Sequence, residues 1–430
     1  MKEESVEIVV SELAAGGEGV GVIERGGERR AVFVRGVAPG ERVRVSADFG
    51  KRPARGRVLE LLAPSPSRVD PPCTWWEACG ACDWMHLGRE TQILAHRDIV
   101  KRAMPERFAG TEPTTHTLPR ALGYRVRTRL HVEARGKKVA VGMFGRRSHE
   151  PVAVGTCIVL DPALERARLA LATLLEGARG KGEASISLGR PDASPRLAVI
   201  DLRWSGELPA EVFARLERAV LEKELAGARV FAGEVKKPAI IGEAAPWIAG
   251  ADGAPLRLAP GGFSQASEEG NALLAKRASE LATALAPPGS AIVELYAGAG
   301  NLTVLFAKNH EVVAVEQDRD ACEAARANLA ARGLSARVVE SDAASYAIGA
   351  KTRLVVLDPP RTGAKDVARA LVDKPVAAIL YVSCDPATLG RDLAILSAGY
   401  DLAALETFEM FPQTSHVETI ATLTRRRGKS

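Results

Sequence analysis

The chain of 430 residues lacks any long apolar run, and this argues against a membrane protein anchored by helices. Its longest apolar runs have the length of a β-strand, whereas a membrane-spanning helix needs about 20 apolar residues. Met1 to Ser5 also lack the basic and then apolar pattern of a secretion signal, and a strand pattern follows directly. We therefore expect a cytoplasmic protein with no membrane partner, and we expect a monomer.

Cysteine is scarce as well, with six in the chain. In a reducing compartment such cysteines are more typical of metal ligands or catalytic groups than of disulfides. Charge is almost balanced: the net charge of +5 permits a nucleic-acid partner without requiring one. The hydrophobic share of 46% and the charged share of 26% are those of a soluble globular protein, and the length predicts two or three domains.

Residues 1–62 are predicted to form a small β-barrel. Short strand patterns at Val6–Val10, Ala31–Val34 and Arg42–Val45 are separated by glycine-rich turns. This spacing is typical of the five-stranded, OB-like oligonucleotide-binding barrel. Basic residues follow its second half: Arg42, Arg44, Lys51, Arg52, Arg55 and Arg57. They can contact RNA or form a solvated charged face, and the sequence favours neither.

After a proline-rich linker, Cys73, Cys79 and Cys82 lie within ten residues of one another. Three thiolates so closely spaced can converge on one centre, and Cys157 is the candidate for a fourth ligand. Zinc and a [4Fe–4S] cluster both accept four thiolates, and the spacing does not separate them. Three ordinary cysteines are a weaker alternative.

The middle of the chain, residues 63–260, is predicted to be an α+β domain with a basic strand. Arg120 to Arg147 hold nine basic residues and one acid, Glu133. Alternation places Arg125, Arg127 and Arg129 on one face of a strand, where they would repel each other unless an anion lies across them. Contact with RNA phosphates is favoured over an edge strand that is merely guarded by charge.

Residues 261–430 show regular βα repetition, which predicts a parallel, Rossmann-like sheet. The first strand runs into the turn Gly298-Ala-Gly300, and Glu316, Asp342 and Asp358 follow later strands. Ligands of such sheets bind at the carboxyl ends of the strands. The pyrophosphate fingerprint lacks its third glycine, because Asn301-Leu-Thr303 follows Gly300. This disfavours a nicotinamide-dependent oxidoreductase and favours a cofactor without phosphates, such as S-adenosylmethionine.

One further strand, Ala377–Val382, ends at Ser383-Cys384-Asp385-Pro386. A thiol at the carboxyl end of a parallel strand faces the ligand crevice and is held rigidly, which suits a nucleophile. A buried structural cysteine is the alternative for Cys384 when the strand is considered alone. Cys322 lies in a predicted helix, where core packing explains it.

Three motifs carry a resemblance to a known family. Asp358-Pro-Pro-Arg361, Val382-Ser-Cys-Asp-Pro-Ala-Thr388 and Phe411-Pro-Gln-Thr-Ser-His-Val-Glu418 resemble the signatures of RNA uracil-C5 methyltransferases, and the likeness covers nearly the whole chain. Residues 1–62 resemble the TRAM domain of that family. The cysteines resemble those of its iron–sulfur members, which implies a [4Fe–4S] cluster. The bacterial 23S rRNA enzymes carry both features, whereas the short bacterial tRNA enzymes lack both.

The resemblance also implies roles for individual residues. Cys384 would be the nucleophile, Glu418 the general base, and Phe263 would lie near a flipped uracil. A cofactor pocket would be lined by Gln265, Tyr296, Asn301, Glu316, Asp342 and Asp358. The helical segment 90–115 would pack on the methyltransferase domain. Ala299 in the turn and Asp385 beside the nucleophile depart from close relatives, but neither is a catalytic position.

We therefore expect a class I methyltransferase domain joined to a central domain and an N-terminal barrel. The expected reaction transfers a methyl group from S-adenosylmethionine to carbon 5 of a uridine in 23S rRNA, through a covalent cysteine–uracil intermediate. The same chemistry on tRNA, and a non-catalytic RNA-binding protein on the same scaffold, are the alternatives.

Overall fold

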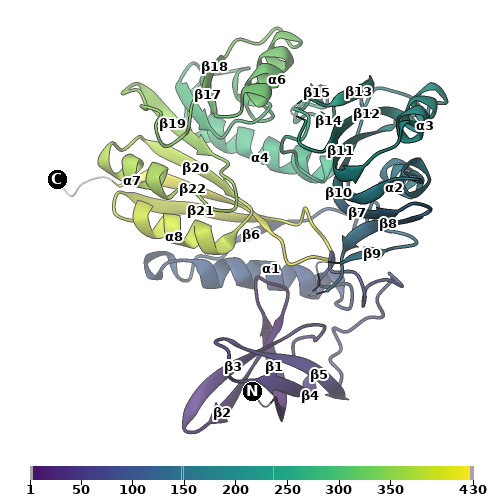
Figure 1. The fold of residues 1–430 in the computed structure, drawn as a ribbon. Helices are drawn as coiled ribbons and strands as arrows, with labels where there is room; N and C mark the ends of the chain where they lie inside the picture. The colour runs from purple at the N-terminus through teal and green to yellow at the C-terminus, as the bar shows by residue number, and fades with distance from the viewer. Residues whose placement is uncertain (1–2, 147, 149, 236, 427–430) are drawn as a thin grey trace.

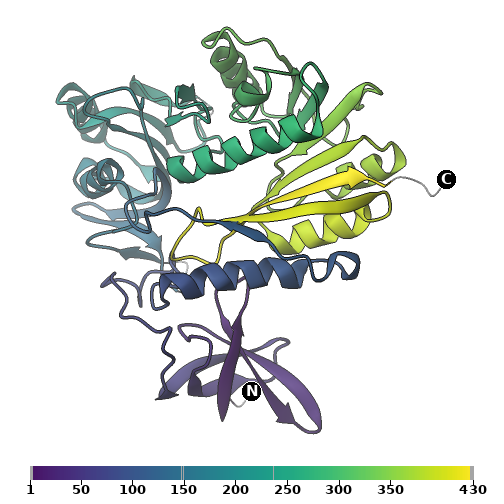
Figure 2. The same ribbon diagram turned by 180° about the vertical axis from the view of Figure 1, so that it is seen from behind.

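Figure 1 shows a computed structural model, which describes residues 3–146, 148, 150–235 and 237–426. A small barrel at the N-terminus, a middle sheet and a larger C-terminal sheet surround the long helix α1, which runs between the barrel and the larger sheet in both views (Figures 1 and 2). Arg147, the last residue of the basic segment, lies outside the described residues. No helix in the described part is long and apolar enough to cross a membrane.

The N-terminal strands close into a barrel in the order β1-β2-β3-β5-β4. Their bounds are β1 Glu4–Leu13, β2 Gly19–Arg25, β3 Glu28–Val34, β4 Arg42–Asp48 and β5 Ala54–Ala63. Alternate apolar residues such as Val32, Val43 and Val45 fill its interior, as the period of two predicts. The basic face of the barrel is partly neutralised, because Arg44 pairs with Glu7 at 2.9 Å and also with Glu60.

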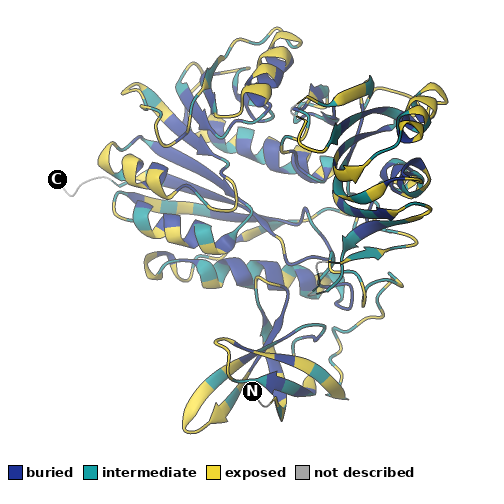
Figure 3. Cartoon of the chain, in the orientation of Figure 1, coloured by how far each residue is buried: buried dark blue, intermediate teal, exposed yellow. Residues whose placement is uncertain are grey.

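The middle sheet has the order β13-β12-β11-β10-β7-β8-β9. Its elements are β7 Arg127–Arg135, β8 Lys138–Phe144, β9 Pro151–Ala153, α2 Pro162–Leu174, β10 Arg179–Leu188, β11 Ala198–Glu207, α3 Ala210–Leu221, β12 Leu225–Ala232 and β13 Ala239–Gly242. Helices α2 and α3 cover one face and share an apolar core with it. Figure 3 shows buried residues concentrated where the layers of the fold meet.

The basic strand predicted to hold Arg125, Arg127 and Arg129 begins later in the structure than the sequence pattern indicated. Arg127 and Arg129 lie in β7, two residues apart and therefore on one face. Arg125 is not in this strand, because its backbone N–H donates to Val159 and its carbonyl accepts from Asp161. The paired strand against β10 begins at Arg127, and the Val126 carbonyl adds one bond from the Leu188 N–H at 3.2 Å, so the sequence alternation extended further than the strand does.

The C-terminal sheet has the order β18-β17-β16-β19-β20-β22-β21-β6. Its strands are β16 Ala291–Leu295, β17 Glu311–Glu316, β18 Arg337–Glu340, β19 Thr352–Leu357, β20 Ala378–Ser383, β21 Tyr400–Phe408 and β22 Glu418–Arg425. Its helices are α4 Glu268–Leu285, α5 Thr303–Phe306, α6 Arg319–Ala330, α7 Lys365–Asp373 and α8 Pro386–Leu396, and the short pair β14 Trp247–Ala249 and β15 Pro255–Arg257 precedes them. Strands β16 to β20 are parallel, and β22 runs antiparallel to β20.

An early segment of the chain packs on this C-terminal sheet. Helix α1 (Arg89–Ala103) contacts α8, and after the turn η1 (Glu106–Phe108) strand β6 (Thr114–His116) pairs in parallel with β21. The two helices approach closely at Gly390, where a Cβ atom would lie 1.9 Å from the carbonyl oxygen of Ala103. Only glycine permits this contact, so α8 is shaped to receive α1.

Candidate functional site

The parallel strands end side by side at one edge of the C-terminal sheet. Leu295 pairs with Val315 on one side and with Leu357 on the other. The next residue on each of these neighbouring strands therefore lies beside the others: Tyr296 after Leu295, Glu316 after Val315 and Asp358 after Leu357. The polar strand ends lie at the edge where ligands of parallel sheets bind, as the sequence predicts.

The turn after β16 has the conformation and the open space that a bound ligand needs. Tyr296 has φ 65°, a strained value for a residue with a side chain, and such strain is common at functional sites. Gly298 has φ 55°, and a Cβ atom there would meet nothing within 4 Å. Its backbone N–H donates to Glu316 Oε2 at 2.9 Å, which ties the turn to the acid of β17.

The remaining predicted cofactor residues differ in whether their polar atoms already have hydrogen-bond partners within the protein. Gln265 is buried, and its Oε1 atom has no hydrogen-bond partner within the described residues. Asn301 instead pairs with Asn271, whose Oδ1 atom accepts from Asn301 Nδ2 at 2.7 Å. Asp342 is exposed and accepts from the Ser345 hydroxyl at 3.1 Å. The orphaned amide oxygen of Gln265 and the space beside Gly298 fit a bound polar cofactor.

Sequence reasoning missed one acid at this edge, Glu294, because it lies inside β16 rather than at its end. Its carboxylate is 2% exposed and accepts a hydrogen bond of 2.6 Å from the Thr303 hydroxyl. The pKa of Glu294 is raised to about 8, chiefly by burial, with Asp358 and Glu316 adding to the rise and the Thr303 hydrogen bond opposing it. The acid thus joins β16 to the helix that follows the glycine turn.

The candidate nucleophile is held by a strand, a turn and a helix. Every residue of β20 is buried, and Cys384 follows it directly. Asp385 then caps α8, because its Oδ1 atom accepts from the Thr388 N–H at 2.8 Å. Burial raises the pKa of the Cys384 thiol to about 12, and the negative charges of Glu418 and Asp358 contribute while Arg361 opposes them.

The candidate base stands opposite this thiol. Ser383 pairs with Thr419 in the antiparallel β20–β22 ladder, so Cys384 and Glu418 face each other one step further on. Side chains at such positions have Cβ atoms about 5 Å apart. Glu418 is 2% exposed, and burial raises its pKa to about 8, with Asp358 raising it and Arg361 lowering it. The two groups predicted from separate motifs are therefore brought together.

The loop before Glu418, residues 409–417, is anchored to the early part of the chain. Asp83 Oδ2 accepts from the Ser415 hydroxyl at 3.0 Å, and Gln92 Oε1 accepts from the Gln413 N–H at 2.8 Å. His96 binds both Glu409 Oε1 at 2.7 Å and the Thr414 carbonyl at 2.9 Å. Sequence reasoning missed these anchors, although Asp83 directly follows the third cysteine.

The predicted RNA residues differ in how far they are exposed. Phe263 is 73% exposed, which is unusual for an aromatic side chain and leaves its ring free to stack. Arg127 is half-buried, and desolvation together with Arg129 and Arg125 lowers its pKa. A small pocket lies between Arg127 and the loop of Pro260, Gly261 and Gly262.

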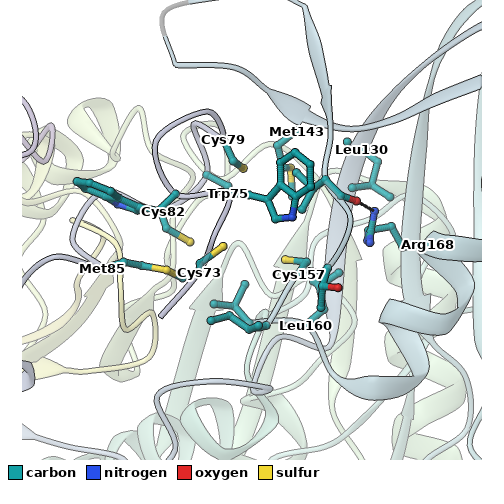
Figure 4. A pocket seen from close by; sticks show the side chains of 17 residues that line it. Cys73, Trp75, Cys79, Cys82, Met85, Leu130, Met143, Cys157, Leu160 and Arg168 are labelled. Atoms are coloured by element: carbon teal, nitrogen blue, oxygen red, sulfur yellow. Dashed lines mark hydrogen bonds between the residues drawn. The ribbon is translucent and has the colours of Figure 1, made fainter. Parts of the chain in front are cut away.

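The predicted cluster ligands share a second site. Cys73, Cys79, Cys82 and Cys157 line one pocket with an empty volume of about 510 Å³, and their sulfur atoms point toward its interior (Figure 4). Burial raises the pKa of Cys82 to about 12, and Cys157 and Cys79 add to the effect. Within the described ranges, no group of three or more His, Cys, Asp or Glu side chains is placed to hold a metal ion.

Two arginines hold this pocket: Arg146, from the basic segment, and Arg168, which the sequence did not single out. Arg168 is 3% exposed, binds Glu165 at 2.7 Å and donates to the Val154 carbonyl at 2.8 Å. Glu165 in turn accepts from the Cys157 N–H at 3.0 Å, so the pair fixes the fourth cysteine. On the other side, Arg146 donates to the carbonyls of Cys79 and Cys82, both at 3.3 Å.

The glycine turn, the strand-end acids and the parallel sheet define a class I methyltransferase domain. Residues 255–379 accordingly match the family model of the methyltransferase small domain, and residues 336–426 match that of the tRNA (Uracil-5-)-methyltransferases.

Whole-length comparisons narrow this class to a family. The chain is 34% identical to the 23S rRNA (uracil(1939)-C(5))-methyltransferase RlmD of Halomonas elongata, over 97% of this chain and 89% of that protein. It is 34% identical to the RlmD protein of Chromohalobacter salexigens, over 98% and 90%. The fold matches the Pyrococcus abyssi tRNA (uracil-54, C5)-methyltransferase with a TM-score of 0.75 and 21% identity, over 97% of this chain and 100% of that one. The chain belongs to the S-adenosylmethionine-dependent RNA uracil-C5 methyltransferases.

Proposed function

We propose that this protein methylates carbon 5 of a uridine in 23S rRNA through a covalent bond between Cys384 and the uracil. The observation that carries the proposal is the position of Cys384 opposite Glu418, one residue beyond the Ser383–Thr419 pair that ends the β20–β22 ladder. The choice of 23S rRNA is supported by the names of the relatives that are 34% identical over nearly their whole length. The tRNA enzyme has the same fold, but a likeness at 21% identity gives no argument that this protein shares its tRNA substrate.

In the proposed reaction, the Cys384 thiolate adds to carbon 6 of the uracil and forms an S–C6 bond. The resulting enolate makes carbon 5 nucleophilic, which uracil itself is not. S-adenosylmethionine, when bound, supplies the methyl group that carbon 5 takes up. Glu418 then removes the proton from carbon 5, and the electron pair of that C–H bond expels the thiolate. Free Cys384 and 5-methyluridine result.

The proposed steps require both Cys384 and Glu418 to lose a proton, and burial opposes both losses. At neutral pH the raised pKa values keep Cys384 as a thiol and leave Glu418 largely protonated. Arg361 lowers the pKa of both groups. It is therefore placed to stabilise a thiolate during attack and a carboxylate during proton removal. Its one hydrogen-bonding side-chain partner within the described residues is His416, at 3.3 Å.

We assign S-adenosylmethionine to the pocket lined by Gln265, Tyr296, Asn301, Glu316, Asp342 and Asp358. The support comes from the unpartnered Gln265 Oε1 atom and the open turn at Gly298. Phe263 and the arginines Arg127 and Arg129 are proposed to contact the RNA, together with Arg125 from the adjoining segment. Extruding the target base into the site costs a few kcal/mol of stacking, which such contacts can offset.

We further propose that Cys73, Cys79, Cys82 and Cys157 hold a [4Fe–4S] cluster. The support is the convergence of four thiols on one pocket whose other lining side chains are largely apolar. Thiolates are the ligands that such clusters take. Residues 1–62 are proposed to be a TRAM-like, OB-like RNA-binding barrel, residues 63–260 a central domain, and residues 261–430 the methyltransferase domain, onto which residues 90–115 pack.

Methyl transfer to RNA from a strain that lacks the enzyme tests the function. Purified protein should label 23S rRNA at one uridine and leave tRNA unlabelled. Cys384→Ala should abolish labelling, whereas Cys322→Ala, which removes a buried thiol in α6, should retain it. Labelling of tRNA alone would transfer the proposal to that substrate. Full activity of Cys384→Ala would overturn the mechanism, and no labelling by the wild-type protein would favour a non-catalytic RNA-binding protein.

Glu418→Gln tests the base separately. Without the base, the S–C6 bond cannot be broken, so methylated RNA should accumulate as a covalent adduct on denaturing gels. Glu406→Gln is the matched control, because Glu406 is equally buried in β21 but pairs with Arg277 at 2.8 Å. An adduct with neither variant would contradict the role of Glu418.

A further inference from the structure

The loop that joins β19 to α7, residues 358–364, carries the arginine that acts on both the candidate nucleophile and the candidate base. Burial raises the pKa of Cys384 and of Glu418, and the Arg361 guanidinium opposes both rises. The Arg361 side chain is nevertheless exposed, and its hydrogen bond to His416 is long, at 3.3 Å. Its place must therefore depend on how the backbone of this segment is held. We call residues 358–364 the Arg361 loop.

One face of α8 holds the backbone of the Arg361 loop. Thr388, Arg391 and Asp392 are spaced by three and four residues, so their side chains lie on the same face of the helix. The Thr388 hydroxyl lies 3.1 Å from the Arg361 carbonyl and 3.3 Å from the carbonyl of the helix cap, and it can donate to either. The Arg391 guanidinium donates to the Thr362 carbonyl at 2.9 Å.

Two fully buried side chains hold the end of the loop. Asp392 Oδ2 accepts from the Ala364 N–H and from the Tyr381 hydroxyl, both at 2.7 Å. The Tyr381 oxygen also lies 3.1 Å from the same N–H. Tyr381 and Asp392 are 0% exposed, so water does not readily replace these bonds when one partner is removed.

The loop and the helix touch at Gly363. Its φ of 74° is a conformation that glycine adopts without strain. A Cβ atom there would lie 2.5 Å from both Arg391 Nη2 and Asp392 Oδ2, and 3.1 Å from the Thr388 Cβ atom. The three helix residues that bond the loop therefore also enclose it, and a side chain at this position would push the loop away from α8.

The same helix also fixes the nucleophile. Cys384 directly precedes Asp385, the cap of α8. A shift of the Arg361 loop relative to α8 would therefore move the guanidinium relative to the thiol. Two of the three sequence motifs meet here, because Thr388 ends the motif that contains Cys384 and Arg361 ends the motif that begins at Asp358.

We propose that Tyr381 and Asp392 are positioning residues, which hold the Arg361 loop on α8 so that the guanidinium stays beside the nucleophile and the base. They act through the Ala364 backbone and not by contact with the reacting atoms. A cation that is already in place stabilises a developing negative charge without a cost of reorganisation during the reaction. This inference rests on the proposed function, because it takes Cys384 as the nucleophile.

The first test measures single-turnover methyl transfer to 23S rRNA. Tyr381→Phe removes the hydroxyl between Asp392 and the Ala364 N–H, and it should slow the transfer by about tenfold. Tyr400→Phe is the matched control and should keep the wild-type rate. Tyr400 is equally buried, and its hydroxyl accepts at 2.9 Å from the N–H of Val376, just beyond the other end of α7. A wild-type rate for Tyr381→Phe would overturn the proposal.

A double variant separates positioning from a general structural role. Arg361→Gln should slow the transfer, and adding Tyr381→Phe to it should cause no further loss, because the two residues act as one unit. Losses that multiply would overturn the proposal, since Tyr381 would then act independently of Arg361. Asp392→Asn leaves an oxygen for the Ala364 N–H and should be slowed less than Asp392→Ala. Equal losses would remove Asp392 from the proposal, and Tyr381→Phe decides the question where Asp392→Ala fails to fold.

A second measurement needs neither RNA nor cofactor. Iodoacetamide reacts with a thiolate, so its rate of reaction with Cys384, followed across a pH series by mass spectrometry of the Cys384 peptide, reports how readily this thiol ionises. The charged groups that act on the thiol are Glu418, Asp358, Arg361 and Asp385. Arg361 is the one among them that favours the thiolate. Its displacement should therefore slow alkylation, by about tenfold for each unit by which the pKa of Cys384 rises.

Tyr381→Phe and Arg361→Gln should both be alkylated more slowly at Cys384 than the wild type at each pH below about 12, and Tyr400→Phe should react at the wild-type rate. Equal rates for Tyr381→Phe and the wild type would overturn the positioning role, even where the labelling of 23S rRNA supports the proposed function. Slower alkylation supports the positioning role even where that labelling fails. The two proposals can therefore fail separately.

Discussion

The raised pKa of Glu418 predicts how the free energy of unfolding changes with pH when no substrate is bound. Burial moves this pKa from 4.5 to about 8 in the folded protein. Between these two pH values the folded state keeps a proton that the unfolded state has lost. The free energy of unfolding must therefore fall as the pH rises through this range, by on the order of 5 kcal/mol in total if the full shift is realised.

The substitution Glu418→Gln removes this effect, because glutamine has nearly the same shape and does not titrate. Near pH 5 the wild-type and variant proteins should have similar free energies of unfolding. The variant should become the more stable of the two as the pH approaches 9, by several kcal/mol. This is a large part of the 5–15 kcal/mol that separates folded from unfolded domains. Urea unfolding at a series of pH values, followed by the circular dichroism of the protein, measures the difference.

Glu406→Gln provides a control of opposite sign. Arg277 and His116 lower the pKa of Glu406 against the effect of its burial, so its carboxylate stabilises the fold above the unfolded pKa and loses that effect as the pH falls. This variant should be less stable than the wild type at neutral pH and should approach it in acid. If the free energies of unfolding of Glu418→Gln and the wild type differ by the same amount from pH 5 to pH 9, then burial does not raise the pKa of Glu418 in the folded protein.

Further predictions concern turnover and the cysteine pocket. The rate of adduct breakdown should rise with pH and level off above about pH 8, because Glu418 must lose its proton to act as a base; stopped-flow decay of trapped adduct measures this, and a flat profile would contradict it. Cys384→Ala should bind S-adenosylhomocysteine in calorimetry as the wild type does, since the thiol does not line the assigned cofactor pocket; loss of binding would place it there. Asp83→Ala should lower kcat by about tenfold at unchanged iron content, because it releases Ser415 from its anchor; an unchanged kcat would show that the loop holds without it. Anaerobically purified protein should be brown and contain iron and sulfide. Arg168→Ala should lower the iron and sulfide content, because it frees the loop that carries Cys157. Colourless protein with stoichiometric zinc would refute the cluster.

The local patterns of the sequence were sufficient for much of the architecture. A period of two predicted the barrel strands, and βα repetition predicted a parallel sheet with acids at the ends of its strands. Glu316 ends β17 and Asp358 follows β19, as expected. Cys322 lies fully buried in α6, as expected for a packing residue. The alternating pattern around Tyr124 predicted a basic strand that is too long. The backbone of Arg125 bonds instead to a nearby segment, Val159 to Asp161.

The sequence by itself determined which residue types stand at the ends of which elements, because side-chain period and turn chemistry are local properties. It placed a thiol after a buried strand and a carboxylate 34 residues later, without showing that they meet. Only the tertiary structure decided this, because the antiparallel register of β22 against β20 sets Glu418 opposite Cys384. The same holds for Asp83, Gln92 and His96, whose partners lie more than 300 residues away in the chain. Burial, and with it the raised pKa values, arises only when these distant segments exclude water from one another.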